Sequence, residues 1–427
     1  MKDPKVLVVG INPWIDNTGI NTLINFFDSW DKESLAHIYT RAGLPSTKIC
    51  DRFFRISEPK VLRSIFKRGI KTGEVVSNSE NAGHSTDDNK IYNKKRGSFT
   101  ALCREVVWML GKWKPKELND FLLEYDADVL FFPVYSNVYM CRLQNYIAKK
   151  TKKPIVLYSS DDNYSYKCVL KDPFSLLHRF WLRQQEKKLF AHADRVMVIT
   201  PKQKEEYDKL FGIDSVVLTK GVDFSDCPFI KRPVSSPVKL VYTGKLIIGR
   251  WKTLAAIAEA LGEINAAERK FELDIYTTDE PTDEQKAALN KNGSQLKGAL
   301  TLSEVQRVQS EADILVFVES LEKKHKNAAR LSFSTKITDY LKSGKCILAI
   351  GGDDIAPIDY FKRYDSAITA TSYAEIGEKL KKLANDSSII AEYAEKAYLC
   401  GKEHHDKIET DKKLKAVITT AATKEFE

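Results

Sequence analysis

Three cations follow a turn near the middle of the chain. Gly244 ends the apolar run 239–243, and Lys245, Arg250 and Lys252 come next, just before an apolar helical pattern. Ligands of open α/β sheets bind at the carboxyl ends of strands, and the N-terminus of a helix favours anions. A diphosphate leaving group needs cations there, because negative charge develops on it as its bond to a sugar breaks. The same residues are compatible with a solvated basic turn.

A second polar cluster opens a helical pattern farther along the chain. Ser334, Thr335 and Lys336 stand at its start, and Asp339 follows one turn later. A Ser or Thr there can simply cap the helix, with Asp339 favoured by the helix dipole. The free amides and Lys336 can equally hold phosphates, while Asp339 accepts the two hydroxyls of a ribose. Both interpretations can hold together.

The first half of the chain offers further candidates. An apolar run leads into Asp161 and Asp162, and adjacent carboxylates at the ligand edge of a sheet can act as acid, base or hydroxyl anchor. Two surface aspartates in a turn are the alternative. The first loop contains Asn17 and Gly19, and a glycine where a helix begins lets a substrate approach the backbone. We therefore take Asp161, Asp162 and Lys252 as catalytic candidates, and Asn17 and Gly19 as acceptor-loop candidates.

Several familiar motifs are missing from the sequence. It has no G-x-G-x-x-G after the first apolar run, no P-loop, no H-E-x-x-H and no G-x-S-x-G, which argues against dehydrogenases, P-loop NTPases, zinc hydrolases and serine esterases. Asp126 precedes its predicted strand and Asp128 opens it, so both lie at the wrong edge of the sheet for a metal site. His404 and His405 lie in a charged helical stretch and are expected to face solvent. We predict no metal and no cofactor.

Unbroken apolar runs alternate with helical patterns, as in a parallel sheet covered on both faces. The alternation predicts right-handed βαβ units and a doubly wound α/β fold. The predicted strands are 5–11, 128–134, 154–159, 195–200 and 215–219, followed by 239–243, 271–277, 313–318 and 346–350.

The chain of 427 residues is too long for one ordinary α/β core. The segment 226–237, DCPFIKRPVSSP, interrupts the alternation and predicts a linker. We place a first domain at 1–230 and a second at 231–388. Residues 72–98 are polar and without period, so they predict a mobile loop. Residues 389–427 are predicted to be helical.

The net charge of +9 arises entirely in the first half of the chain. Residues 52–118 hold 15 basic residues against 7 acidic ones, interleaved with Phe53, Phe54, Phe66, Trp108 and Trp113. Basic helices with aromatic side chains are typical of contact with an anionic membrane surface. The alternative is that the aromatic residues are core and the cations a solvated face. We expect no nucleic-acid partner.

The seven cysteines are scattered and form no Cys-x-x-Cys pair, which indicates a reducing compartment. No apolar run approaches the roughly 18 residues that span a bilayer, and the N-terminal residues lead directly into a predicted strand. We therefore expect a cytoplasmic protein, either free or held at the inner face of the plasma membrane.

The two-domain pattern and the clusters at 244–252 and 334–339 resemble the GT-B glycosyltransferases of family 4. The likeness is carried by YSSDDNYSY, TKGVDF, FVES and LSFSTKITDYLKSGKCILAIG, and is closest to the branch from bacterial exopolysaccharide, capsule and cell-wall clusters. The resemblance implies two Rossmann-like domains facing a cleft, the first binding the acceptor and the second the nucleotide sugar. It also implies that helices in 389–427 cross back to the first domain.

The resemblance assigns roles residue by residue. Lys245 stands where the family usually has an arginine, and Lys252 matches its phosphate-binding lysine. Asp339 matches the second glutamate of the family's Glu-x7-Glu motif, which anchors a ribose, but the first glutamate is replaced by Leu331. A histidine usual near 160–162 is also absent. The predicted donor-binding residues are Gly244, Lys245, Arg250, Lys252, Ser334, Thr335, Lys336 and Asp339.

The activity that the resemblance implies is transfer of a hexose from a nucleotide diphosphate sugar, such as a UDP-sugar, to a lipid-linked or polysaccharide acceptor. It implies retention of configuration, no metal, and a place in surface polysaccharide or cell-wall synthesis. A sugar-nucleotide epimerase or phosphorylase of the same fold is an alternative. A degenerate carbohydrate-binding protein is another, suggested by Leu331, although the retained Lys245, Lys252 and Asp339 argue for a working phosphate site.

Overall fold

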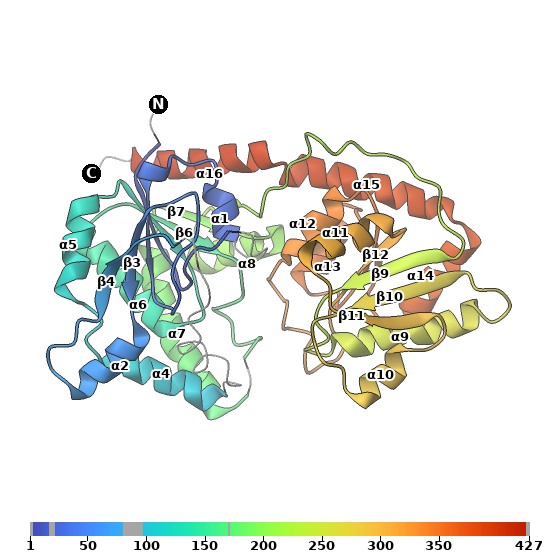
Figure 1. Ribbon diagram of the computed structural model, residues 1–427, viewed down its shortest axis with the longest axis horizontal. Coiled ribbons are helices and arrows are strands. Elements are labelled where there is room, and N and C mark those ends of the chain that lie inside the picture. Colours follow the sequence, from blue (N-terminus) through green and yellow to red (C-terminus); the bar gives the residue numbers. More distant parts are fainter. Residues whose placement is uncertain (1–2, 17–21, 80–96, 170, 424–427) are drawn as a thin grey trace. The chain divides into compact units, whose positions relative to one another are not determined.

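The computed structural model describes residues 3–16, 22–79, 97–169 and 171–423. Its contacts divide the chain into two compact units (Figure 1). The first unit contains Met1–Ile199, Gln203–Leu218 and Asp411–Glu427, and the second contains Thr200–Lys202 and Thr219–Thr410. The division therefore precedes the proline-rich segment 226–237, which forms no helix or strand.

The first unit is built on an eight-stranded sheet of order β4-β3-β2-β1-β5-β6-β7-β8. All neighbouring strands are parallel except β3 and β4, which are antiparallel. The strands are β1 (Val6–Val9), β2 (Leu35–Tyr39), β3 (Arg52–Ile56), β4 (Gly73–Val76), β5 (Val129–Pro133), β6 (Ile155–Ser159), β7 (Arg195–Val198) and β8 (Val216–Val217).

Helices cover both faces of this sheet, and for that reason its central strands are mostly apolar and are buried along their whole length. All four residues of β1 are buried, as are all five of β5 and of β6. The helices are α1 (Thr22–Phe27), the short 3-10 helix η1 (Lys32–Ser34), α2 (Glu58–Phe66), α4 (Ser98–Leu110), α5 (Lys116–Tyr125), α6 (Val138–Thr151), α7 (Pro173–Ala191), α8 (Pro201–Phe211) and α16 (Lys407–Ala422).

The C-terminal helix α16 belongs to the core of the first unit. Its residues Leu414 and Ile418 are buried in the cluster formed by β1, α1 and β5. Lys415 pairs with Asp3 at a distance of 2.5 Å. The chain thus returns at its end to the unit in which it began, and that unit is assembled from distant parts of the sequence.

The second unit has a six-stranded, all-parallel sheet of order β11-β10-β9-β12-β13-β14. Its strands are β9 (Val238–Thr243), β10 (Phe271–Tyr276), β11 (Ser294–Gly298), β12 (Ile314–Val318), β13 (Cys346–Ile350) and β14 (Ile368–Ala370). Its helices are α9 (Arg250–Ile264), α10 (Asp283–Leu289), α11 (Leu302–Glu311), α12 (Thr335–Lys342), α13 (Ala356–Arg363), α14 (Tyr373–Asn385) and α15 (Ser388–His405).

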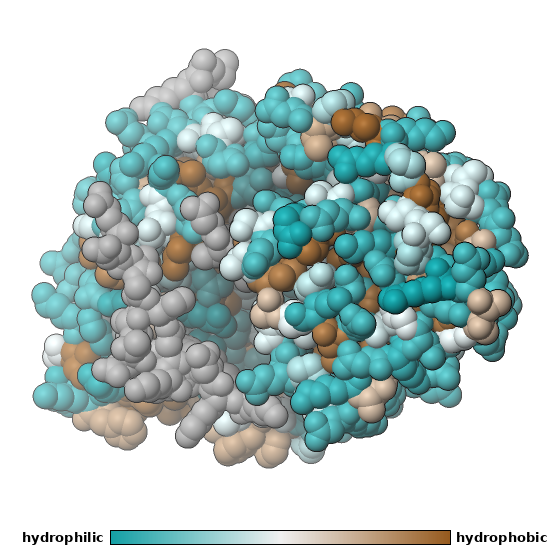
Figure 2. Space-filling model, turned by 45° about the vertical axis from the view of Figure 1, so that its right-hand side comes forward, coloured by the Kyte–Doolittle hydropathy of each residue, from teal (hydrophilic) through white to brown (hydrophobic). Residues whose placement is uncertain are grey.

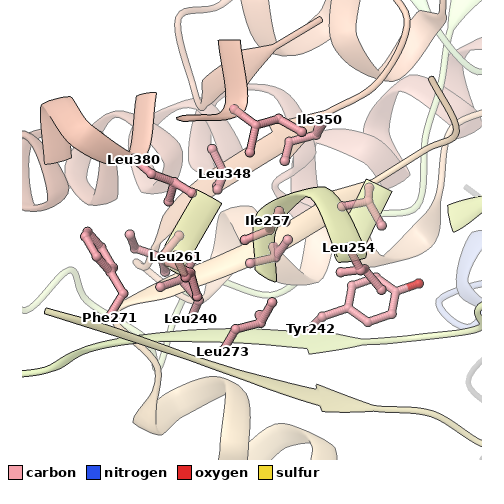
Figure 3. Close-up of a cluster of buried hydrophobic side chains, with 14 of the residues drawn as sticks. Leu240, Tyr242, Leu254, Ile257, Leu261, Phe271, Leu273, Leu348, Ile350 and Leu380 are labelled. Carbon is pink, nitrogen blue, oxygen red and sulfur yellow. The ribbon is translucent and has the colours of Figure 1, made fainter. Parts of the chain in front are cut away.

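One face of this sheet is packed by α9 and α14 (Figure 3). Leu254, Ile257 and Leu261 recur at the helical spacing of three and four residues, so they form one apolar stripe on α9. The stripe lies against Leu240 of β9 and against the neighbouring strands. This packing fixes the N-terminus of α9 close to the carboxyl end of β9.

In each sheet the strand order reverses beside a central strand. In the first unit the reversal lies between β1 and β5, and in the second between β9 and β12. Loops leave such neighbouring strands in opposite directions, which opens a crevice at their carboxyl ends where ligands bind. In the second unit, the residues that follow β9 and β12 are therefore the candidates for a ligand-binding site.

The predicted strands that form the centre of each sheet are all present, with ends shifted by one or two residues. Five further strands have no counterpart among the predicted ones, and most of them lie toward the sheet edges: β2, β3, β4, β11 and β14. Residues 73–76 form β4, so the assignment of the whole of 72–98 to a loop was wrong at its start. Residues 80–96, together with Asn17 and Gly19, lie outside the described part of the chain.

Candidate functional site

The turn after β9 places Gly244 beside the amine of Lys336. Lys336 Nζ donates to the carbonyl oxygen of Thr243, the last residue of β9, at 2.6 Å. A Cβ at Gly244 would collide with that amine and would lie 2.8 Å from the hydroxyl of Tyr242. Glycine at this position therefore allows the lysine of α12 to reach the end of β9.

Arg250, the first residue of α9, is held by the residue that follows β12. Arg250 Nε lies 3.0 Å from Glu319 Oε2, and one of its terminal nitrogens lies 2.7 Å from Oε1. Glu319 is buried, and its carbonyl oxygen accepts from the hydroxyl of Thr253 at 3.0 Å. Such a two-bond pair fixes the orientation of the guanidinium, so the reversal point of the sheet carries an oriented cation.

Lys252 is exposed and pairs with Glu322 at 2.5 Å. Gly249 caps α9 with a φ of 76°. A Cβ there would lie 2.5 Å from the hydroxyl oxygen of Ser320 and 3.0 Å from a carboxylate oxygen of Glu322. Both the backbone conformation and the available space therefore require glycine, and the tight turn keeps Lys252 close to the segment after β12.

The cluster carries more positive than negative charge. Burial, together with the smaller effect of the charge of Arg250, lowers the pKa of Lys336 to about 8. Lys245 is exposed and, among the described residues, makes no ion pair. Three carboxylates, those of Glu319, Glu322 and Asp279, act on the four basic side chains. The cluster keeps a net positive charge, and an anionic ligand would favour the charged form of Lys336.

The start of α12 behaves as the capping interpretation predicts. Ser334 is the N-cap, and its side chain accepts from the backbone N–H of Lys336 at 3.4 Å. Thr335 is the first helical residue and is partly buried. Asp339 is exposed and pairs with Lys220 at 2.9 Å. Its carboxylate is accessible for a hydroxyl contact once that pair opens.

Leu331 is completely buried, so this position contributes packing where the related family has a carboxylate. The two acids that do meet the cations, Glu319 and Glu322, come from the segment directly after β12. Glu319 belongs to the FVES stretch that carries part of the family likeness, but no role was predicted for it. The signal was its place at the carboxyl end of a buried strand.

The aspartates after β6 have different environments. Asp162 is buried, and its carboxylate accepts from the backbone N–H and the hydroxyl of Ser165 at 2.9 and 2.5 Å. Asp161 is exposed, while its carbonyl oxygen accepts from Gln203 at 3.2 Å. Asp162 therefore holds its own loop in shape, whereas the carboxylate of Asp161 stands at the surface.

The aromatic residues of the basic region are mostly core. Phe53, Phe54, Trp108 and Trp113 are buried, and only Phe66 of the five is exposed. The expectation that they interleave with the cations on the surface was wrong for these four. Phe53 and Phe54 lie in β3 and Trp108 on the inner side of α4, while Trp113 follows α4 and its ring meets that of Tyr146. The basic residues of the region that do lie on the surface include Arg63, Lys67, Arg68, Lys112 and Lys114.

His405 corrects another expectation, because it is buried and not solvent-facing. Its two ring nitrogens lie 2.6 Å from the hydroxyl of Thr219 and 2.7 Å from that of Tyr360. Across residues 3–16, 22–79, 97–169 and 171–423, no group of three or more His, Cys, Asp or Glu side chains is arranged to hold a metal ion. In the same ranges no helix is long and apolar enough to cross a membrane.

No protein-family model and no curated protein match the sequence. Solved structures do match. Anabaena Alr3699/HepE, in complex with UDP, covers 98% of this chain and 100% of its own at 10% identity, with a TM-score of 0.61. Sucrose-phosphate synthase from Thermosynechococcus elongatus covers 97% and 98% at 9% identity, with a TM-score of 0.59. The α,α-trehalose 6-phosphate synthase of Burkholderia multivorans covers 98% and 97% at 10% identity, with a TM-score of 0.58.

The chain has the GT-B fold. The prediction of the fold class is thereby confirmed: the likeness extends over both sheets and almost the whole chain. Within the GT-B fold of this chain, the second unit brings Gly244, Arg250, Lys252 and Lys336 together at the reversal point of its sheet. Asp339 lies on the same helix as Lys336, one turn farther along.

Proposed function

We propose that the protein is a glycosyltransferase that moves a hexose from a nucleotide diphosphate sugar, such as a UDP-sugar, to a lipid-linked or polysaccharide acceptor. We place it at the cytoplasmic face of a bacterial membrane, in surface polysaccharide or cell-wall synthesis, with retention of configuration. The observation that carries the proposal is the cluster of basic side chains at the carboxyl ends of β9 and β12, where Lys336 is partly buried and has a lowered pKa. HepE, a neighbour in fold, is described in complex with UDP and with UDP-glucose.

In the proposed reaction a hydroxyl of the acceptor forms a bond to the anomeric carbon of the sugar. The bond from that carbon to the diphosphate oxygen breaks, and its electron pair leaves with the diphosphate. Lys245, Lys252 and Lys336 stabilise this developing charge, so the proposal includes neither a metal nor a cofactor. The proton of the acceptor hydroxyl goes to a carboxylate or to the leaving phosphate, and Asp161 is the exposed carboxylate we propose for the first route. Asp339 would bind the ribose.

The proposal is tested by Lys252→Ala, with Lys381→Ala as the matched control. Both lysines are exposed and form one ion pair each in the second unit, Lys252 with Glu322 and Lys381 with Glu263. Titration calorimetry with UDP should show at least about tenfold weaker binding for Lys252→Ala, as expected when a charge-assisted contact to phosphate is lost. The control should bind like wild type, and neither change should alter the melting temperature appreciably.

The activity assay identifies which product carries the sugar, and this distinguishes a transferase from an epimerase. A transferase releases UDP and glycosylates an acceptor, whereas an epimerase returns an altered nucleotide sugar. Wild-type affinity of Lys252→Ala for UDP, or UDP binding by neither protein, would contradict the donor site.

Attachment to a membrane is proposed from the surface of α2 and α4. Phe66 is 85% exposed and Leu110 61%, and basic residues flank both. Attraction to anionic lipid amounts to about 1 kcal/mol for each well-placed basic residue. Vesicles of phosphatidylglycerol and phosphatidylcholine should sediment the protein at low salt and release it as salt rises. Binding should weaken when glutamine replaces Arg63, Lys67, Arg68, Lys112 and Lys114. Absence of binding at low salt would contradict the proposal.

A further inference from the structure

The first unit contains a pocket of about 670 Å³ at the carboxyl edge of its sheet. Segments that follow successive strands form its wall: Arg41 comes after β2, Glu58 after β3, Asn137 after β5 and Cys168 after β6. Helices α4 and α7 complete it. The volume is that of pockets that bind small molecules. No residue of this pocket belongs to the donor cluster, which lies in the second unit.

Both carboxylates of the pocket already have partners within the protein. Glu58 forms an ion pair with Arg104 and accepts from the indole N–H of Trp108 at 3.2 Å. Glu105 accepts from the first two backbone N–H groups of α6, at 3.0 and 2.8 Å, and lies 3.3 Å from His178 Nε2. Glu105 therefore stabilises the N-terminus of α6, and its negative charge is compensated within the protein.

Two arginines of the pocket, Arg41 and Arg179, form no ion pair within 4.0 Å among the described residues. Arg41 donates to the side-chain oxygen of Asn12 at 3.0 Å, and Arg179 donates to the carbonyl oxygen of Asp162 at 3.1 Å. Arg179 also interacts with Glu186, but burial raises the pKa of that carboxyl to about 8, so it is largely neutral at pH 7. Both guanidiniums keep free N–H donors in a planar fork that matches phosphate oxygens.

One wall of the pocket is apolar and adjoins an apolar surface, while Ser98, Thr100 and Ser136 add hydroxyl groups elsewhere in the lining. Pro59, Leu62, Ala101 and Val107 line it from α2 and α4. Helix α4 packs against both α2 and α7, and the rings of Phe99 and Phe174 meet at 5.2 Å. These three helices lie together in the first unit (Figure 1), and hydrophobic atoms appear along its lower margin (Figure 2). The exposed apolar side chains on them are Leu62, Phe66, Phe99, Met109, Leu110, Phe174, Leu176, Leu177 and Phe180.

We propose that this pocket binds the phosphate group of a membrane-anchored acceptor, a lipid phosphate or diphosphate. Arg41 and Arg179 hold the phosphate, and the hydrocarbon chain leaves over the apolar surface of α2, α4 and α7. Charge and hydrophobicity both select this class of ligand. A neutral glycan would offer no anion to the exposed Arg41 or the partly buried Arg179, and a soluble sugar phosphate would leave the apolar surface uncovered. The assignment rests on the proposed function, since it names the substrate class of that reaction.

The test uses dodecyl phosphate below its critical micelle concentration, dodecyl glucoside as the neutral amphiphile and glucose 6-phosphate as the anion without a chain. Binding to the full chain is followed by titration calorimetry. Dodecyl phosphate should bind, and each of the other two should bind at least about tenfold more weakly, because each lacks one of the two contributions. If dodecyl glucoside binds as tightly as dodecyl phosphate, the pocket recognises the chain but not the phosphate. If glucose 6-phosphate binds as tightly, the acceptor is a soluble phosphate. Either result overturns the proposal.

The variants are Arg41→Gln and Arg179→Gln, with Arg52→Gln as control. Arg52 is exposed in the same unit, at the start of β3 and thus at the opposite edge of the sheet. Each pocket variant should bind dodecyl phosphate about tenfold or more weakly than wild type. The affinity of Arg179→Lys should lie between those of wild type and Arg179→Gln, because lysine keeps the charge but lacks the planar pair of N–H donors. Unchanged affinity in correctly folded Arg41→Gln and Arg179→Gln would refute the assignment.

UDP binding is measured in the same proteins and should not change. If UDP fails to bind wild type while dodecyl phosphate binds and responds to the arginines, the proposed donor reaction fails and the phosphate pocket stands. If UDP binds and dodecyl phosphate does not, the pocket assignment alone fails.

Discussion

Replacing Lys336 by methionine should stabilise the protein while weakening the binding of its donor. The amine of Lys336 is buried next to Arg250, and its pKa falls from the ordinary 10.5 to about 8. Keeping that amine charged at pH 7 thus costs free energy in the folded state. Methionine is similar in length and shape and carries no charge, so it removes this cost and leaves the packing of α12 nearly unchanged.

The magnitude follows from the pKa and from one hydrogen bond. A change from 10.5 to about 8 corresponds to about 3 kcal/mol of unfolding free energy. The variant loses the hydrogen bond from Lys336 Nζ to Thr243, which is worth about 1 kcal/mol. Lys336→Met should therefore be about 2 kcal/mol more stable than wild type at pH 7, without ligand.

The effect has a defined pH dependence. The pKa of Lys336 is lower in the folded than in the unfolded protein, so the destabilisation is fully present below pH 8. It disappears as the pH rises from about 8 to 10.5, where the amine is neutral in both states. The advantage of Lys336→Met should shrink across this interval. In wild type, the affinity for UDP should fall above about pH 8, because the free amine is then uncharged.

Urea unfolding at pH 7 and pH 9.5, followed by fluorescence and circular dichroism, measures the stability. Titration calorimetry measures UDP binding, which should weaken at least about tenfold in the variant. Lys342→Met, on the same helix, is the control and should change stability by less than about 0.5 kcal/mol. Lower stability of Lys336→Met than of wild type at pH 7 would contradict the prediction that the charge of Lys336 destabilises the free protein. Wild-type affinity of the variant for UDP would contradict a role of that charge in anion binding.

Two further predictions concern the acids around this cluster. Asp339→Ala should raise the donor's KM more than it lowers kcat in initial-rate measurements, since a ribose contact is similar in ground and transition states; a loss confined to kcat would assign the carboxylate to the chemistry. Glu319→Gln leaves the partly buried Arg250 without its ion pair and should lower the free energy of unfolding by about 3 kcal/mol in urea titrations. A neutral effect of Glu319→Gln on stability would mean that solvent, not Glu319, compensates Arg250.

Much of the fold could be predicted from the sequence because the strands at the centre of each sheet are buried on both faces. Such strands are predominantly apolar, and β5, β6, β12 and β13 stand out as nearly unbroken runs. Edge strands carry no such signal. The strand β11, with the sequence SQLKG, is recognised only from its pairing with β10.

The candidate site was predictable in part, and for a related reason. Residues directly after a buried strand can be located from the strand itself, and Gly244, Lys245 and Asp161 were found in this way. Residues that enter a site from the middle of a helix cannot. Arg179 lies in α7, and only the fold brings it to the pocket of the first unit.

The composition of residues 52–118 did not predict which of their aromatic side chains lie on the surface. The aromatic residues among the cations of 52–118 suggested a membrane face, but Trp108 packs against Tyr139 with ring centroids 4.3 Å apart, inside the first unit. Local sequence does not distinguish a buried tryptophan from an exposed one when a helix has one face of each kind. The exposed apolar residues of α7, outside the region chosen by charge, are equally part of the surface we assign to lipid.

The burial of the ion pairs in the second unit separates two roles among its cations. The pair between Arg250 and Glu319 is largely buried, so opening it would leave two charges without compensation. The pair between Lys252 and Glu322 is exposed, and opening an exposed pair costs little. A diphosphate should therefore take Lys252 from Glu322 and leave Arg250 bound to Glu319. On this argument Arg250 positions the N-terminus of α9, and Lys252 is the cation that changes partners as the donor binds and departs.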